Sequence, residues 1–316
     1  MYILILLTTL ATATCLIFWV LRRPLHNAHP EQLRLALIAT DRLLELLNLL
    51  QQYRGMSTAA RGGVLHFSQE LSKKQALIEK AFAGLMQDLA AEADEAFPCV
   101  VPQDVKLLRY QWQLAVTKNN RFSLSDHYAE QSVIVSHVLD WLNSFGKKRL
   151  LPHFLSLSVD EGSVKTMVHH YTQALPVLAE VVAQMRGYAS YVAAQAELGT
   201  QESAVLRTSL QQAEAYLTTE EGAVEIYQHA GSRAQNIARQ IVQQFINLVR
   251  REILDCRKID LDPEFCFRMG SRAVDSVFNW IAVERIGLLA LWSGDAVQQA
   301  VPAQPLAEKR IEPAVV

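Results

Sequence analysis

Long stretches of helix-forming residues, separated by short groups of glycine and proline, fill the sequence between residues 30 and 292. Leucine, alanine, glutamine, glutamate and arginine dominate these stretches, and no stretch alternates apolar and polar residues convincingly with a period of two. The pattern therefore predicts an all-α fold. We expect eight helices, at residues 31–68, 71–95, 104–118, 125–145, 163–198, 201–217, 219–258 and 263–292.

Several local signals place the ends and bends of these helices. Gly146 is expected to end the fourth helix, Pro152 to lie in the loop after it, and Pro176 to kink the fifth helix. Thr218 is expected to cap the seventh helix, and Asp262 the eighth. Short connections make neighbouring helices antiparallel, so we expect up-and-down bundles, either one long bundle or two four-helix bundles that share long helices.

The amino terminus has a different character. Residues 2–21 form an uncharged segment of about 20 residues, which is long enough for a transmembrane helix. Trp19 lies near its end, and Arg22 and Arg23 follow it. We interpret residues 1–23 as an uncleaved single-pass anchor in the inner (cytoplasmic) membrane, with the rest of the chain on the cytoplasmic side. Residues 31–292 would form the helical domain, and the proline-containing residues 293–316 a disordered tail.

Several classes of function are disfavoured. A net charge of −2 gives no basic field for nucleic acid, and four scattered cysteines form neither a zinc motif nor a disulfide framework. No nucleotide-binding, metalloprotease or serine-hydrolase motif occurs. We therefore expect neither an enzyme nor a protein with a cofactor or a bound metal.

A short motif occurs twice, 132 positions apart. The segment around Arg54 reads Gln-Tyr-Arg-Gly, and the segment around Arg186 reads Gln-Met-Arg-Gly. Each arginine continues an apolar helix stripe, and small residues follow it. Both guanidinium groups should therefore face inward, and one copy in each half of the chain favours two related bundles.

Two interpretations of these arginines stay open at this point. No acidic residue stands three or four positions from either arginine, so a small planar anion between them would match their paired donors. Alternatively, each arginine pairs with a carboxylate from another helix, for which Asp126, Asp140 and Glu180 are candidates.

The first arginine segment resembles the signature of the nitrate- and nitrite-sensing (NIT) domain family. In that family a Leu-Gln-x-Glu-Arg-Gly run is followed by small residues, and Leu50 to Ser57 fits this run except at Tyr53, where glutamate is usual. The segment around Arg186 resembles the later arginine helix of the family. The resemblance covers residues 31–292 and implies two four-helix bundles that hold nitrate or nitrite between helices.

Carried over by position, the resemblance implies ligand-binding roles for Arg54 and Arg186. Arg233, with Arg239 behind it, is the candidate for a third arginine. Ser57 is expected to line the same cavity, and Arg61 its mouth.

The expected function is a membrane-anchored oxyanion sensor that signals by helix displacement. No kinase, chemoreceptor hairpin or RNA-binding antiterminator domain follows the helices, so the signal would go to an unknown protein partner, and a homodimer is possible. The alternative is a membrane-tethered helical adaptor or structural protein, with internally paired arginines and no small ligand.

Overall fold

The computed structural model describes residues 30–64, 66–89, 98–117, 123–157, 161–219 and 230–292. The expected membrane anchor at residues 1–23 and the expected tail at 293–316 lie outside these ranges. Every regular element within them is helical, as expected. None of the helices in this part of the chain combines the length and apolarity that crossing a membrane requires.

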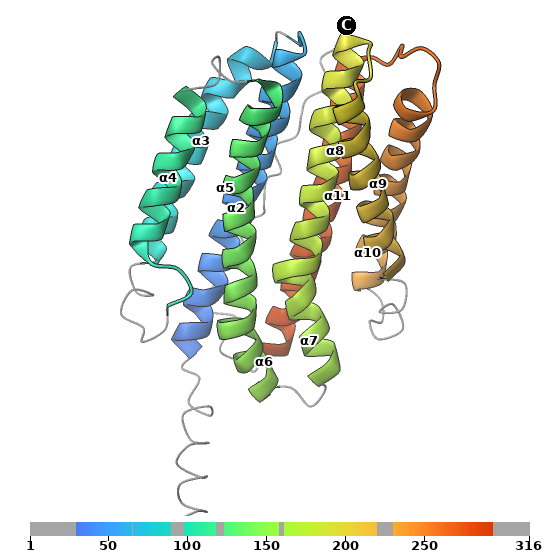
Figure 1. Ribbon diagram of the computed structural model, residues 1–316. Helices are drawn as coiled ribbons and strands as arrows, with labels where there is room; N and C mark the ends of the chain where they lie inside the picture. Colours follow the sequence, from blue (N-terminus) through green and yellow to red (C-terminus); the bar gives the residue numbers. More distant parts are fainter. Residues whose placement is uncertain are drawn as a thin grey trace, which may run out of the picture.

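The helices follow one another in up-and-down order (Figure 1). Their bounds are α2 Pro30–Arg61, α3 Phe67–Asp88, α4 Pro102–Thr117, α5 Leu124–Phe145, α6 Leu151–Leu157, α7 Glu161–His169, α8 Leu175–Gln195, α9 Thr200–Thr219, α10 Ala230–Val249 and α11 Pro263–Trp292, with π-helical segments η3 Gly146–Leu150, η4 His170–Ala174 and η6 Arg250–Leu254.

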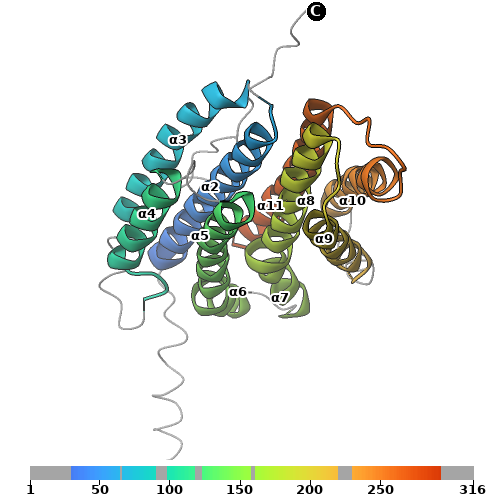
Figure 2. The same ribbon diagram turned by 45° about the horizontal axis from the view of Figure 1, so that its top comes forward.

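The helices fall into two groups. Helices α2 to α5 form one side of the molecule and α8 to α11 the other, and both views show α3 and α4 at one flank and α9 and α10 at the opposite flank (Figures 1 and 2). Helices α2 and α8 pack against each other across the middle. This arrangement agrees with the expected helical bundles.

Helix α8 is the most deeply buried of these elements. Its sequence from Leu175 to Gln195 contains only two charged residues, Glu180 and Arg186, and both are buried together with the apolar residues around them. A helix that is apolar all round is covered on every side. Helix α8 is enclosed by α2, α9 and α11, and it therefore forms the centre of the fold.

Helix α5 ends at Phe145, as expected, but the expected loop with Pro152 does not follow it. The fourth helix continues through Gly146 into η3 and then α6, where Pro152 is the second residue. Gly146 has helical torsion angles, and a Cβ there would overlap the Thr172 side chain of η4, so the glycine permits close packing and does not cap a helix. Pro176 likewise follows the π-helical segment η4. A π-helical turn changes the backbone pairing locally, which accommodates the N–H that proline lacks.

One expected helix cap is wrong and another is confirmed. Thr218 lies within α9, where its hydroxyl donates to the Glu214 carbonyl 2.9 Å away, so it does not start the next helix. Both Asp262 carboxylate oxygens accept backbone N–H groups of the first turn of α11, each at 3.1 Å. Pro263 is the first residue of that helix.

Candidate functional site

The two copies of the arginine–glycine motif meet where α2 and α8 cross. A Cβ built on Gly187 would lie 3.7 Å from the Gly55 Cα, so the two glycines face each other. A Cβ on Gly55 would lie 3.0 Å from Nη2 of Arg186 and 3.1 Å from its Nε. The missing side chain at Gly55 therefore gives the Arg186 guanidinium its space, and it explains why a glycine follows Arg54 in a buried helix.

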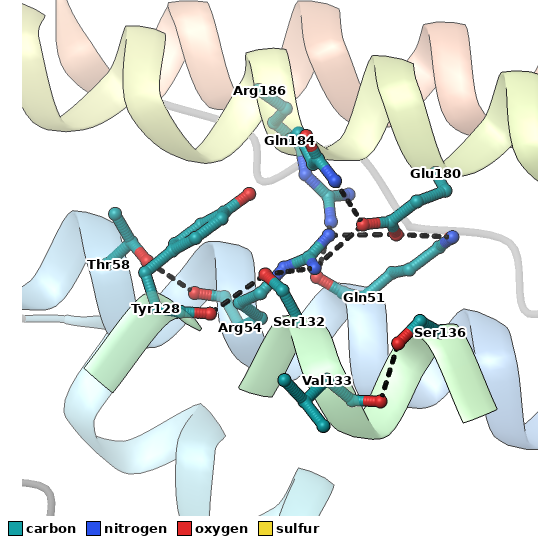
Figure 3. A network of polar contacts seen from close by, with 10 residues as sticks. All are labelled: Gln51, Arg54, Thr58, Tyr128, Ser132, Val133, Ser136, Glu180, Gln184 and Arg186. Carbon is teal, nitrogen blue, oxygen red and sulfur yellow. Dashed lines mark hydrogen bonds and ion pairs between the residues drawn. The ribbon is translucent and has the colours of Figure 1, made fainter. Parts of the chain in front are cut away.

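Arg54 already has a carboxylate partner within the protein. Its Nη1 and Nη2 lie 2.7 and 2.8 Å from the two carboxylate oxygens of Glu180 on α8, and Nη1 also donates to Ser132 Oγ at 2.9 Å (Figure 3). The Arg54 side chain is only 1% exposed. Burial by itself lowers the pKa of Arg54, but the charge of Glu180 leaves that pKa above its ordinary value. Of the two interpretations left open by the sequence, pairing with a carboxylate from another helix is therefore confirmed for Arg54, and Glu180 is the partner.

Glu180 accepts hydrogen bonds from two further side chains. Gln51 donates to its Oε2 at 3.0 Å, and Gln184 donates to its Oε1 at 2.7 Å (Figure 3). Both carboxylate oxygens are thus satisfied by a bidentate arginine and two amides. Such a pair is strong because it is charge-assisted and buried.

Arg186 has no such partner. Its Nη2 donates to the backbone carbonyl of Gln51 at 2.8 Å, and its Nη1 donates to Ser271 Oγ at 3.1 Å. Its guanidinium carbon lies 4.8 Å from the centre of the Phe267 ring. Among the described residues, it makes no ion pair with any carboxylate, although its side chain is buried.

The electrostatic state of Arg186 reflects this environment. Burial lowers its pKa to about 10, the charge of Asp275 offsets part of that effect, and the charge of Arg54 adds to it. Asp275 is exposed and makes no ion pair with Arg186, although its charge acts on Arg186 from α11. Burial raises the pKa of the Asp275 carboxyl, and the charge of Arg186 counteracts that rise. Asp275 therefore offsets the charge of Arg186 only in part. The cluster formed by Gln51, Arg54, Tyr128, Ser132, Glu180 and Arg186, called the arginine cluster below, holds two guanidinium groups and one carboxylate. One positive charge is therefore in surplus.

Several polar atoms of the arginine cluster are buried without a hydrogen-bond partner in the described part of the chain. They are Arg54 Nε, Arg186 Nε, Tyr128 Oη and Gln51 Oε1. Three of these atoms carry a hydrogen that can be donated. Buried polar groups in native proteins normally find a partner, which includes water or a ligand, so a group of open donors around surplus positive charge is typical of an anion site.

The other expected site residues are distributed differently. Ser57 is buried beside the cluster, but its hydroxyl donates to the Arg54 carbonyl at 3.0 Å. Arg61 is half-buried near the end of α2, close enough to lower the pKa of His127. Arg233 is exposed on α10, which packs mainly against α11, and Arg239 is half-buried on the same helix. The structure brings Arg54, Arg186 and Ser57 together, and it does not bring Arg233 to them.

Sequence reasoning missed the contribution of α5. The centre of the Tyr128 ring lies 4.7 Å from the Arg54 guanidinium carbon and 4.5 Å from the centre of the Tyr188 ring, to which it is tilted by 55°. Ser132 accepts a hydrogen bond from Arg54. Burial raises the pKa of Tyr128, so its hydroxyl stays protonated. A signal existed in the sequence, because His127 and Gln131 begin the same stripe as the core residues Ile134 and Val135.

His127 is a buried base beside this site. Its Nε2 lies 2.8 Å from the Gln131 amide nitrogen, and its Nδ1 has no partner among the described residues. Burial, aided by the charge of Arg61, lowers the pKa of His127 to about 4. His127 is therefore neutral at pH 7 and adds no charge to the cluster.

Tyr53, the departure from the family signature, points away from the arginines. Its hydroxyl accepts a hydrogen bond from Gln75 of α3 at 3.0 Å, and its ring meets Trp112 of α4 edge-on at 4.7 Å. The tyrosine thus changes the packing among α2, α3 and α4. The carboxylate that neutralises Arg54 comes from α8 instead.

Comparisons with known proteins support the fold at a distance. The sequence matches no protein-family model and no curated protein. Among solved structures, one described as the NasR transcription antiterminator matches with a TM-score of 0.63 and 14% identity, over 87% of this chain and 73% of that chain. At such low identity the likeness shows a related helical fold, and it says nothing about the ligand of this chain.

Proposed function

We propose that this chain is a sensor that binds a small planar oxyanion, nitrate or nitrite, at the arginine cluster. The observation that carries the proposal is Arg186, a buried guanidinium that makes no ion pair with any carboxylate among the described residues. Isolated buried charges are costly, and proteins normally neutralise them with a partner or a ligand. The chain is distantly similar in fold to a transcription antiterminator, and an antiterminator domain is one of the output domains looked for after the helices. This similarity supports a role as a sensor.

The chemistry of the cluster suits such a ligand. Nitrate and nitrite are planar anions whose oxygens accept paired N–H donors, which arginine presents in a fixed plane. Open donors remain at Arg186 Nε, Arg54 Nε and Tyr128 Oη. A bound anion would supply the acceptors that these atoms lack.

Signalling would use the position of the cluster between helices. Tyr128 belongs to α5 and Arg186 to α8, and Arg186 also donates to the Gln51 carbonyl of α2, so an anion held by Tyr128 and Arg186 would couple the two groups of helices. A ligand shifts a conformational equilibrium only when it binds the two states unequally. We propose that the anion favours the packing in which α5 and α8 lie closest to α2.

Thermal unfolding of the full chain in mild detergent tests this proposal. Nitrate and nitrite should raise the melting temperature, whereas chloride at the same ionic strength should not. At an anion concentration of about 100 times Kd, binding adds about 2.7 kcal/mol to the free energy of unfolding, which is a shift of several degrees. Arg186→Gln should abolish the rise.

Arg233→Gln is the matched control, because it removes an exposed arginine of α10. It should leave the nitrate response unchanged. An unchanged melting temperature of the wild-type chain at millimolar nitrate and nitrite would contradict the sensor proposal.

One observation favours a second function. Because both terminal nitrogens of Arg54 are paired with Glu180, the cluster also resembles the internal ion pair of a helical adaptor or structural protein. On that alternative Arg186 would be satisfied by Ser271 and the Gln51 carbonyl alone. The absence of any anion response, together with capture of a partner protein by the purified chain, would support the adaptor.

A further part of the proposal concerns where the chain is located in the cell. We propose that residues 1–23 anchor it in the inner membrane, that residues 31–292 lie on the cytoplasmic side, and that a separate protein receives the signal. Alkaline extraction of membranes should leave the full chain in the pellet and release a chain that lacks residues 1–25. Release of the full chain would contradict the anchor.

A further inference from the structure

We propose that the arginine cluster selects a singly charged planar oxyanion, which Arg186 and Tyr128 bind while Glu180 stays on Arg54. This inference rests on the proposed function and assigns a separate role to each charged residue of the cluster. Glu180 sets the charge of the acceptable ligand, and Tyr128 adds a neutral donor.

The first step concerns the occupancy of Arg54. A carboxylate is itself a planar oxyanion, and Glu180 already takes the paired Nη1 and Nη2 donors of Arg54 at 2.7 and 2.8 Å. Two amides, from Gln51 and Gln184, hold the same carboxylate. An incoming anion would have to replace three hydrogen bonds and the Nη1–Oε1 ion-pair contact to displace Glu180, so the anion goes to the open donors instead.

The second step concerns charge. Glu180 cancels one of the two guanidinium charges within the cluster. Asp275 lies outside the cluster, is exposed and offsets the charge of Arg186 only in part, so the cluster itself keeps a single positive charge for a ligand. A monovalent anion makes the buried cluster neutral. A divalent anion such as sulfate would leave a net negative charge out of contact with water, which is unfavourable in a buried site.

The third step concerns the donors. Arg186 Nε and Tyr128 Oη are both buried and without a partner in the described part of the chain. Tyr128 lies against Gly187, the residue after Arg186, because a Cβ there would be 3.8 Å from its hydroxyl oxygen. Burial keeps the tyrosine protonated, so it donates a hydrogen without adding charge.

Titration calorimetry of the full chain with sodium nitrate and sodium sulfate, at equal ionic strength, tests the inference. The wild-type chain should bind nitrate in preference to sulfate. Glu180→Gln raises the surplus to two positive charges, so the ratio of sulfate affinity to nitrate affinity should rise about tenfold or more. A purely structural role of Glu180 would lower stability and leave that ratio unchanged.

Two further variants keep the test decisive if Glu180→Gln folds poorly. Ser271→Asp places a carboxylate beside Nη1 of Arg186, which now contacts the serine at 3.1 Å, and it should abolish nitrate binding without loss of the fold. Tyr128→Phe removes one neutral donor, so nitrate affinity should fall about tenfold while the ratio of sulfate to nitrate affinity stays as in the wild type.

The outcomes separate the two proposals. If the wild-type chain binds neither nitrate nor nitrite, the proposed function itself fails. If it binds nitrate, but sulfate binds equally well or Ser271→Asp retains full nitrate affinity, only the inference about charge selection is overturned.

Discussion

Arg54 and Arg186 occupy equivalent places in a repeated motif, yet their surroundings differ. Arg54 is held by a bidentate carboxylate and a serine hydroxyl. Arg186 is held by a backbone carbonyl and a serine hydroxyl, and it lies over a phenyl ring. One guanidinium is thus neutralised within the protein and the other retains its charge.

The neighbouring helices account for this difference. Glu180 stands on α8 and faces α2, so it reaches Arg54, while the residues around Arg186 come largely from α11. Helix α11 supplies the uncharged contacts Ser271, Phe267 and Gly270. Its Asp275 acts on Arg186 through its charge, but it is exposed and makes no ion pair with Arg186. A repeated sequence therefore produces two environments when the surrounding helices are not repeated.

Replacing each arginine in turn should give the largest difference in the free energy of unfolding between the two sites. Arg54→Met leaves Glu180 buried without a cation, so the free energy of unfolding should fall by about 3–5 kcal/mol. Arg186→Met removes a buried charge that has no carboxylate partner, so the free energy of unfolding in the absence of oxyanions should stay the same or rise by up to about 2 kcal/mol. Urea unfolding in chloride buffer measures both.

The control for this pair is Glu214→Ala, which breaks the partly exposed ion pair with Arg250. That change should cost no more than about 1 kcal/mol. Equal losses for Arg54→Met and Arg186→Met would show that the two arginines are equivalent and would contradict the account.

Protonation of His127, the buried neutral base next to the cluster, should have the second largest effect on the free energy of unfolding. Because the pKa of His127 is lowered to about 4, the unfolded chain binds more protons than the folded chain between about pH 4 and pH 6.5. Stability should therefore fall as the pH falls through this window, by up to about 3 kcal/mol. Unfolding free energies measured at several pH values test the prediction.

His127→Gln should flatten this dependence, because glutamine keeps a polar side chain but does not titrate. A profile of the variant that is as steep as that of the wild type would assign the pH dependence to other groups.

A glycine that packs against Arg186 and a glycine in open space should respond differently to substitution, with smaller effects on stability. In Gly270→Ala the added Cβ would lie 2.6 Å from Arg186 Cγ and 2.8 Å from a Phe245 ring carbon, so we expect a loss of about 1–3 kcal/mol in the free energy of unfolding. Gly84→Ala in α3, where a Cβ meets nothing within 4 Å, should instead stabilise the chain by about 0.5–1 kcal/mol. Chemical denaturation compares the two variants.

In the double variant Gly270→Ala with Arg186→Ala the overlap with Arg186 Cγ disappears, whereas the overlaps with the Cβ at position 186 and with Phe245 remain. Part of the lost stability should return, and a loss that stays the same would place the strain at that Cβ and at Phe245.

Much of the fold could be predicted from the sequence. Helix-forming composition predicted the all-α class, and Asp262 followed by proline predicted the start of α11. The expected fifth helix is instead divided into α7, η4 and α8, and the fourth continues through η3 into α6. The π-helical segments before Pro152 and Pro176 could not be predicted, because the tight packing of Gly146 on Thr172 depends on contacts between helices.

The candidate site could be predicted only in part. Apolar stripes correctly placed Arg54 and Arg186 inside the protein, since the residues around them face the core. The choice of Glu180 among three candidate carboxylates required the register between α2 and α8, which no local pattern encodes. Tyr128 could not be recognised either. An aromatic residue on a helix face usually belongs to the core, and only the structure shows that the Tyr128 hydroxyl lacks a partner among the described residues.

We propose that Glu180 neutralises Arg54, whereas Arg186 stays open to an anion. The most direct test is the ¹⁵N–¹H spectrum of arginine Nε groups during a nitrate titration of the full chain, with the two signals assigned from Arg54→Lys and Arg186→Lys. We expect the Arg186 Nε–H signal to shift most and to saturate with the Kd found by calorimetry. A signal from Arg186 that does not move while nitrate binds, or a larger shift at Arg54, would contradict it.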